Sequence, residues 1–244
     1  MRVFFYLLLF STLVFSCSKK DEKSNSEISY TKAKKMLDKH DYAAAAEAFE
    51  KIDDEFPFSK WGSKGKVMAL YARYKNEEND KVLQIADDVV SLTPNSEYVP
   101  YVMYMKGLIY YKQIPSIERA QDNTKLASST FRELIARFPA DFHAEDAEQK
   151  LQFIDEHLAG AKMAVGRNHI ENNNYVGAIG NFYDVIRSHR GSNQAPEAYF
   201  RIAESYYKIG LKEEGLDVVG EMRRRFPEND WTKMAIKLTE NFGK

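Results

Sequence analysis

The chain is poor in cysteine, in net charge and in long hydrophobic runs. Cys17 is the only cysteine among 244 residues, which excludes an internal disulfide and a zinc site built from cysteines. The 35 basic and 36 acidic residues give a formal net charge of −1, whereas nucleic-acid binding needs a strong basic field. The one basic cluster, Arg223–Arg225, precedes a proline at a predicted helix end, where cations suit the helix dipole. We therefore expect no nucleic acid among the partners.

Motifs for catalysis and metal binding are also missing from the sequence. The histidines form no His-Glu-x-x-His pair, and no Gly-x-Ser-x-Gly nucleophile elbow occurs. Gly160 and Gly166 fall within a predicted helix and form no phosphate-binding loop. We therefore expect no enzyme activity, no metal and no cofactor. The alternative, an enzyme that these motifs do not reveal, is tested by looking for turnover that survives removal of bound partners.

The N-terminal apolar stretch is too short to span a membrane. It runs from Val3 to Phe15, 13 residues, whereas a spanning helix needs about 20. Its length fits the apolar region of a secretory signal peptide, which is about 7–15 residues long. Cys17 follows Ser16, and "VFSC" resembles the bacterial lipobox, whose cysteine is acylated before cleavage. We predict a lipoprotein signal peptide at residues 1–16 and lipidation (palmitate) of Cys17. The alternative is a stray cysteine in an ordinary signal peptide.

A polar segment follows the cysteine. The ten residues "SKKDEKSNSE" contain no apolar side chain, and such a segment cannot bury enough surface to fold alone. We predict a flexible, lipidated tether at residues 17–27.

The rest of the chain carries a helical repeat. From Ile28 onward the apolar residues are spaced by 3 and 4, which is typical of amphipathic helices. "AFEKIDDEFP" (48–57) recurs as "TFRELIARFP" (130–139), and weaker copies end at Pro94 and Pro227. A fifth copy has Arg190 where the proline would stand. The pattern resembles the tetratricopeptide (TPR) repeat, a helix–turn–helix of 34 residues. We predict an all-α TPR solenoid of about five helix pairs with a C-terminal capping helix at 231–242.

The repeat register predicts small residues where the two helices of a repeat come close. Position 8 of the repeat falls at Ala33, Leu70, Gly107, Gly166 and Ala203, and position 20 at Ala45, Val82, Ala127, Ala178 and Gly215. Leu70 and Val82 are large, so we expect the second repeat to be splayed or shifted.

Two insertions interrupt the repeats. The polar stretch at 113–123 predicts a loop, and the helix-forming stretch after Pro139 predicts one long helix at about 143–172. We predict repeats 1–3 at residues 28–140, and the long linking helix, repeats 4–5 and the capping helix at residues 141–244.

Several phrases together resemble the BamD family, the TPR lipoproteins of the machinery that inserts β-barrel proteins into the bacterial outer membrane. They are the lipobox cysteine, "FPFSKW", "ALYARYK", "YVMYMKGL", "FRELIARFP" and "LQFIDEHLAGAKMAVGRNHIENNNYVGA". The resemblance runs from Ile28 to about Thr232. Two features depart from it, the short loop at 113–123 and the missing proline of repeat 4, and they put in doubt an accessory partner that uses that loop.

The resemblance implies a scaffold on the periplasmic face of the outer membrane, held by its lipid. Ser18 after the cysteine fits outer-membrane sorting. The C-terminal repeats would dock a BamA-like barrel subunit, and the N-terminal repeats would bind unfolded outer-membrane β-barrel proteins. The alternative is another periplasmic TPR lipoprotein, one that scaffolds peptidoglycan or other cell-envelope enzymes.

Tyrosines and lysines gather at the register positions that line the concave face of a TPR array. The residues at these positions are Tyr30, Lys34 and Leu37 in repeat 1, Tyr71, Tyr74 and Lys75 in repeat 2, and Tyr101, Tyr104, Leu108, Tyr111 and Lys112 in repeat 3. Tyrosine rings would take apolar side chains, and a lysine would take a terminal carboxylate. We predict a groove for the C-terminal strand of unfolded barrel proteins. For each tyrosine, packing in the core remains an equal alternative.

Overall fold

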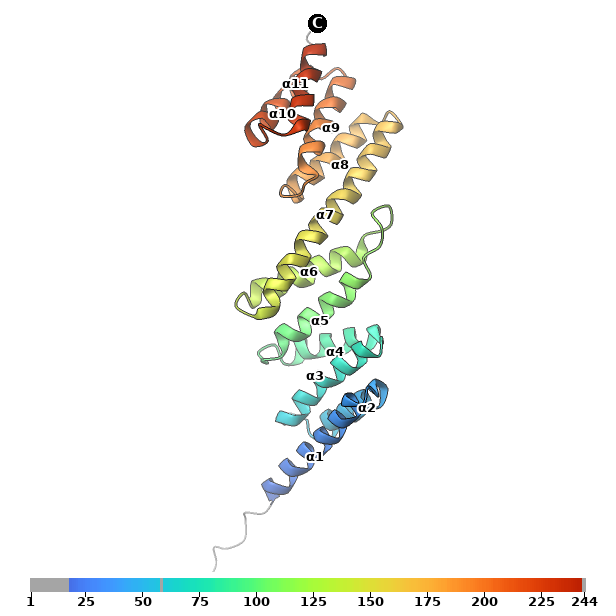
Figure 1. Cartoon of the computed structure of the whole chain (residues 1–244), viewed down its shortest axis with the longest axis vertical. Coiled ribbons are helices and arrows are strands. Elements are labelled where there is room, and N and C mark those ends of the chain that lie inside the picture. The colour runs from blue at the N-terminus through green and yellow to red at the C-terminus, as the bar shows by residue number, and fades with distance from the viewer. Residues whose placement is uncertain (1–17, 58, 243–244) are drawn as a thin grey trace, which may run out of the picture. The chain divides into compact units, whose positions relative to one another are not determined.

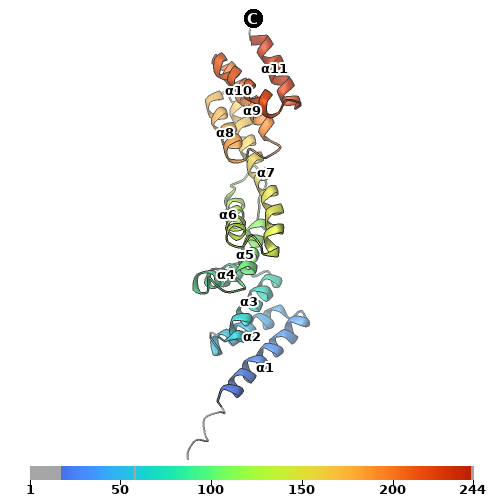
Figure 2. The same ribbon diagram turned by 90° about the vertical axis from the view of Figure 1, so that its left-hand side faces the viewer.

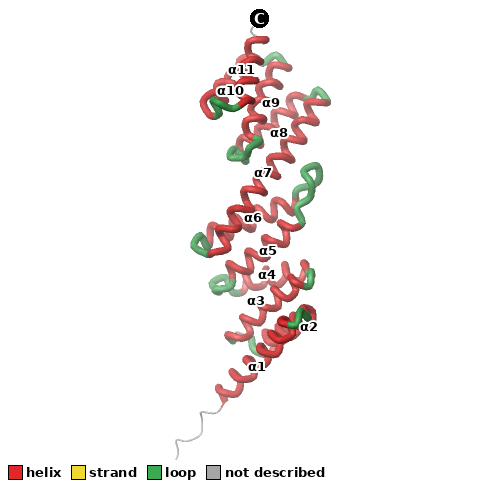
Figure 3. The backbone as a smooth tube through the Cα atoms, in the orientation of Figure 1, coloured by secondary structure: helices red, strands yellow, loops and turns green. Residues whose placement is uncertain are grey.

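The computed structural model describes residues 18–57 and 59–242. All regular secondary structure in these residues is helical (Figures 1 and 3). The helices are α1 (Ser18–Asp38), α2 (Tyr42–Glu55), α3 (Lys60–Lys75), α4 (Asn79–Leu92), α5 (Val99–Lys112), α6 (Asp122–Arg137), α7 (Phe142–Glu171), α8 (Tyr175–Ser188), α9 (Ala195–Lys208), α10 (Lys212–Arg225) and α11 (Asp230–Phe242). The all-α TPR-like class is therefore confirmed. Within the described ranges, no helix has the length and the apolar character that crossing a membrane requires.

The chain divides into two compact units after Leu92, and not at residue 140 where we placed the boundary. The first unit holds α1–α4 and the second holds α5–α11. The long helix α7 explains the difference. It packs on α6 near its start and on α8 farther along (Figure 2), so that repeat 3 belongs with repeats 4 and 5.

The second helices of the repeats end as the sequence predicts. The residues after α2, α6 and α10 are Phe56, Phe138 and Phe226, and each donates its backbone N–H to the carbonyl four residues earlier. A proline follows each of them and cannot continue the helix. Helix α8 ends in the same way at His189, where no proline follows. The proline is therefore not required for this helix end.

The residues at repeat positions 8 and 20 are all buried. Leu70 and Val82, the two large exceptions, are also fully buried. In the first unit the backbone of α3 comes close to α2 of the preceding repeat, because Gly62 and Gly65 face the carbonyl oxygens of Phe56 and Phe49. In repeat 2 the glycines that allow close approach therefore lie on the face of α3 that packs against repeat 1.

The ends of α7 and α11 match the predicted boundaries, but α1 begins ten residues early. The helix starts at Ser18, so residues 18–27 are helical and the prediction of a flexible tether there was wrong. The segment contains no proline and no glycine and is rich in Lys and Glu, which favour helix. Extending the helix that starts at Ile28 also avoids the cost of nucleating a new one.

Candidate functional site

Tyr30 lies in the core of the first unit. It is 7% exposed, and its ring centroid is 5.3 Å from that of Phe49 and 4.8 Å from that of Trp61. The ammonium of Lys64 lies over the outer side of the ring, 5.1 Å from its centroid. The prediction that Tyr30 lines a groove is therefore wrong, because Trp61 and Lys64 of α3 cover it. Lys34, one turn farther along α1, is exposed as predicted.

The predicted residues of α3 are accessible. Tyr71 and Tyr74 are half-buried and Lys75 is exposed. Spacings of three and four residues place them on one helix face. The Lys75 ammonium lies 5.7 Å from the centroid of the Tyr42 ring. The first unit thus presents two tyrosines and a lysine together on α3.

The three predicted tyrosines of α5 face α7 in the second unit. The ring centroids of Tyr101 and Tyr104 lie 5.5 Å and 4.8 Å from the centroid of the His143 ring. The ring of Tyr111 lies 5.6 Å from Phe153. All three tyrosines remain half-buried rather than covered, and Lys112 at the end of α5 is exposed.

A polar group joins these tyrosines. The Tyr104 hydroxyl donates to Asp146 Oδ2 at 2.5 Å, and Lys150 Nζ donates to the same oxygen at 2.6 Å. Lys150 also lies over the Tyr111 ring, 5.5 Å from its centroid. Burial opposes ionisation of Asp146, but the hydrogen bonds from Lys150 and Tyr104 outweigh it and lower the pKa of Asp146. The carboxylate therefore stays charged and fixes the Tyr104 hydroxyl.

Two phenylalanines of α7 extend this aromatic surface, and sequence reasoning missed them. Phe142 is 78% exposed and Phe153 is 50% exposed. We call the set the α5–α7 aromatic seam: Tyr101, Tyr104 and Tyr111 of α5 with Phe142, His143, Phe153 and His157 of α7. The TPR register covers only repeat positions, whereas Phe142 and Phe153 belong to the inserted turns of α7. Their eleven-residue spacing, three helical turns on one face, was the signal that could have found them.

The C-terminal repeats carry a charged group on α9. Arg201 contacts Glu197 and Glu204 at 3.3 Å and 2.9 Å. Its guanidinium lies 5.5 Å from the centroid of Phe200 and 5.6 Å from that of Trp231. The arginine is therefore held over two aromatic rings while its guanidinium pairs with two carboxylates of its own helix.

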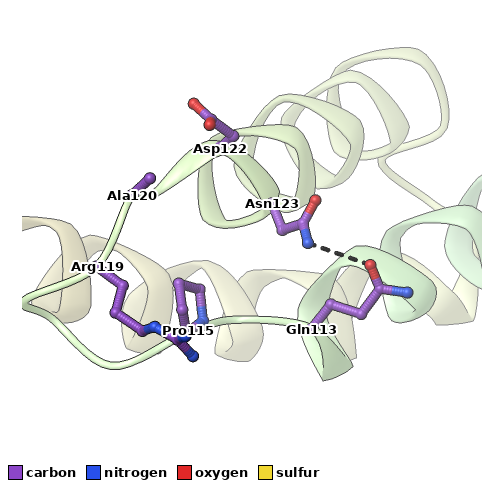
Figure 4. Close-up of a pocket in the computed structure, with 6 residues that line it drawn as sticks. All are labelled: Gln113, Pro115, Arg119, Ala120, Asp122 and Asn123. Atoms are coloured by element: carbon purple, nitrogen blue, oxygen red, sulfur yellow. Dashed lines mark hydrogen bonds between the residues drawn. The ribbon is translucent and has the colours of Figure 1, made fainter.

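Two cavities of the described residues have largely polar linings. A cavity of about 400 Å³ in the first unit is lined by residues of both charges from α2, α3 and α4, among them Glu50, Lys66 and Asp88. A cavity of about 370 Å³ lies at the loop between α5 and α6, where Asn123 Nδ2 donates to Gln113 Oε1 at 3.1 Å (Figure 4). Neither lining contains a nucleophile next to a base. Across residues 18–57 and 59–242, no group of three or more His, Cys, Asp or Glu side chains could hold a metal ion.

Comparison with known proteins gives one family. Residues 21–218 match the family model YfiO, described as an outer membrane lipoprotein. The chain is 31% identical over 222 residues to the outer membrane protein assembly factor BamD of Caulobacter vibrioides, covering 91% of this chain and 73% of that protein. It is 29% identical over 242 residues to BamD of Rickettsia prowazekii, covering 97% and 96%.

Solved structures that resemble this one include TPR proteins. The TPR2AB domain of yeast Sti1, in its pHSP90 complex, aligns with a TM-score of 0.45 at 12% identity, covering 90% of this chain and 84% of that one.

Proposed function

Since the chain belongs to the YfiO family of outer membrane lipoproteins, which includes BamD, we propose that it is a scaffold that brings unfolded β-barrel proteins to the subunit that inserts them. The chain is an outer membrane protein assembly factor of that family. The partners and the surfaces that follow are our proposal.

We assign the binding of unfolded barrel proteins to the tyrosine- and lysine-bearing first helices. The observation that carries this is the grouping of half-buried tyrosines with an exposed lysine on the same helix, Tyr71, Tyr74 and Lys75 on α3. The α5 set adds Tyr101, Tyr104, Tyr111 and Lys112, and α1 adds Lys34. A tyrosine ring that is partly open to solvent can bury an apolar side chain, and a lysine can bind a carboxylate by a charge-assisted hydrogen bond.

We assign docking of a BamA-like barrel subunit to the C-terminal repeats. Arg201 supports this, because a guanidinium held over Phe200 and Trp231 is pre-organised for a carboxylate of a partner. The scaffold would be held at the periplasmic face of the outer membrane by lipid on Cys17, which lies outside the described residues.

We further propose that the protein acts without catalysis, metal or cofactor. The alternative, a scaffold for peptidoglycan enzymes, would use the same fold with other partners. Solubilising membranes and isolating the tagged full-length protein distinguishes the two. Our proposal requires a large barrel subunit in the complex, and recovery of peptidoglycan enzymes in its place would contradict it.

Photo-crosslinking tests the substrate surface. A crosslinking residue at Tyr71 or Tyr104 is expected to capture a peptide copied from the last strand of a barrel protein. Converting the terminal carboxylate of the peptide to an amide should weaken capture, because the lysines lose their ionic partner. The control position is the exposed Lys208 on α9. Equal capture by a crosslinking residue at Lys208 would contradict the assignment. Equal capture of the amidated peptide and the peptide with a free carboxylate would also contradict it.

A further inference from the structure

We propose that the α5–α7 aromatic seam is by itself a strand-binding site, complete within the second unit, with Phe142 and Phe153 as its apolar anchors. The inference rests on the proposed function for the class of its ligand, the C-terminal segment of an unfolded barrel protein. It assigns binding of the apolar side chains of this segment to Phe142 and Phe153, which lie in the inserted turns of α7 and outside the repeat register.

The rings of the seam form two groups of contacts, which the buried ring of Phe131 connects from beneath. At the start of α7 the Phe142 and His143 rings are 3.8 Å apart, and His143 contacts Tyr104 of α5 at 4.8 Å. Three turns later Tyr111 contacts Phe153 at 5.6 Å, and Phe153 stacks on His157 at 5.8 Å. Beneath the seam the buried ring of Phe131 lies 6.2 Å from Tyr104 and 6.3 Å from Tyr111. The tyrosines thus bridge the core and the exposed phenylalanines.

Packing explains the tyrosines better than it explains the phenylalanines. Tyr104 and Tyr111 cover the core residue Phe131, so a stability role would suffice for them. Phe142 and Phe153 leave 78% and 50% of their surface in water. A single exposed apolar side chain is ordinary. Two exposed phenylalanines on the same helix face, on either side of the Asp146–Lys150 pair, leave more apolar surface in water than packing requires, and such surface marks an interaction site.

The length of the seam suits a short extended segment. Phe153 lies eleven positions after Phe142 on α7, so the two residues are about 16 Å apart along the helix axis. Side chains on one face of a strand are about 6.6–6.8 Å apart. The seam can therefore take the same-face side chains of a strand about five residues long, which fits alternating apolar residues.

The charges along the seam favour a segment that ends in a carboxylate. Its middle is neutral overall, because Lys150 pairs with Asp146 at 2.6 Å. Its start is acidic, with Asp141 bonded to His143 at 2.7 Å and with Glu145 exposed. At its other end the exposed Lys112 follows Tyr111. The carboxylates of α7 at that end already have partners, because Asp155 pairs with Arg132 at 2.9 Å and Glu156 accepts the backbone N–H of Asn193 at 2.7 Å. An uncharged strand with its terminal carboxylate at the Lys112 end complements this distribution.

The test measures binding of a fluorescent peptide to the purified full-length protein by anisotropy. The peptide has alternating apolar residues and a free C-terminal carboxylate. Phe142→Ala and Phe153→Ala are each expected to weaken binding about 2- to 12-fold, as for the loss of one aromatic contact. Their thermal midpoints should match the wild type, since both side chains are largely exposed. The matched control is Val176→Ala in α8, because Val176 is 71% exposed and lies outside the seam.

The outcomes separate this inference from the function on which it rests. If Phe142→Ala and Phe153→Ala bind the peptide like the wild type, the seam assignment fails while the proposed function stands. If Tyr71→Ala combined with Tyr74→Ala abolishes all binding, the claim that the seam is complete within the second unit fails. If the wild type binds no peptide, the proposed function fails and the inference fails with it.

Discussion

Gly107 of α5 faces the ring of Phe131 of α6 with no space for a side chain. A Cβ at residue 107 would lie 2.4 Å from Cε1 of that ring. The same relation recurs two helices later, where a Cβ at Gly166 would lie 2.4 Å from Cε1 of Phe182. In these two repeats the small residue at position 8 therefore accommodates an aromatic ring of the second helix, rather than a direct contact between the two backbones.

We predict that the effects of Gly107→Ala and Phe131→Ala on stability are not additive. Phe131→Ala should cost about 3–5 kcal/mol of unfolding free energy, as expected for a fully buried ring. Gly107→Ala alone should destabilise through overpacking, by about 1–3 kcal/mol. In the Phe131→Ala background it should stabilise instead, because alanine favours helix over glycine by about 0.5–1 kcal/mol. Urea denaturation of the single and double variants measures the coupling.

Two controls accompany this cycle. At Gly180 of α8 an added Cβ meets no atom within 4 Å, so Gly180→Ala should stabilise by about 0.5–1 kcal/mol. The Glu133 side chain is 55% exposed, and Glu133→Ala should change stability by less than about 0.5 kcal/mol. Additive effects of Gly107→Ala and Phe131→Ala would show that the ring does not occupy the space above the glycine.

The buried Arg73 should be a second determinant of stability. It is 4% exposed, and its guanidinium donates to Glu50 at 2.9 Å and 2.6 Å and to Glu78 at 3.0 Å and 2.9 Å. These bonds tie α3 to α2 and to the turn before α4. The hydrogen bonds that Arg73 donates to Glu50 raise the pKa of Arg73, although burial opposes this. The guanidinium therefore stays charged.

Arg73→Met should destabilise the first unit by about 1–3 kcal/mol, the cost of leaving polar groups without partners. The loss should fall below that for a fully buried ion pair, because the Glu50 side chain is 37% exposed to water. Arg73→Lys should lose part of this energy, since lysine cannot bind two carboxylates with a planar fork. Arg137→Lys, in an exposed pair with Glu133, is the matched control and should stay within about 0.5 kcal/mol. Equal denaturation midpoints for Arg73→Met and the wild type would exclude this role.

The repeat skeleton was predictable from sequence because it depends on local rules. Apolar spacing, small residues and prolines located the helices. The long helix α7 begins at Phe142, one residue before the predicted start. The boundary between the units was not predictable in this way. It depends on α7 packing against both α6 and α8, and helical periodicity does not report which repeats share a core.

The site was less predictable, because register gives the face of a helix and not its neighbours. Tyr30 has the register of a groove residue, but the ring of Trp61 and the ammonium of Lys64 cover it. Arg73 sits in an ordinary run, "YARYK", and only the folded chain brings Glu50 to it. Two sets of predicted residues, Tyr71 and Tyr74 in the first unit and the seam tyrosines in the second, keep their predicted exposure.

A third prediction concerns pH and the end of α8. The side chain of His189 is 13% exposed, and its Nδ1 lies 3.7 Å from Asp155 Oδ1, too far for a good hydrogen bond. Burial lowers the pKa of His189 and outweighs the attraction of Asp155. The folded state therefore binds this proton less readily than the unfolded state does. Its contribution to stability should be complete above the unfolded pKa of about 6.5 and should be lost as the pH falls through the lower folded value.

Substituting His189→Asn should remove this part of the pH dependence. Denaturation midpoints at a series of pH values below 7 measure it, and the wild-type midpoint should fall faster than that of the variant as the pH is lowered. His40→Asn is the control, because His40 is exposed at the turn after α1. A steeper pH dependence in the His189→Asn variant than in the wild type would show that protonated His189 stabilises the fold through Asp155.

The last prediction concerns the anchor at Cys17, whose structure lies outside the described residues. The apolar stretch before it is 13 residues long, and no helix within the described ranges could cross a membrane. We propose that lipid on Cys17 attaches the protein to the membrane, since each buried CH₂ of a lipid chain contributes about 0.8 kcal/mol. Cys17→Ser should abolish incorporation of a labelled fatty acid and release the processed protein into the soluble fraction. The control is Ser18→Ala, which keeps the cysteine and should leave labelling intact. Equal labelling of Cys17→Ser and the wild type would show that Cys17 is not the acylated residue. The proposed attachment through Cys17 would then be wrong.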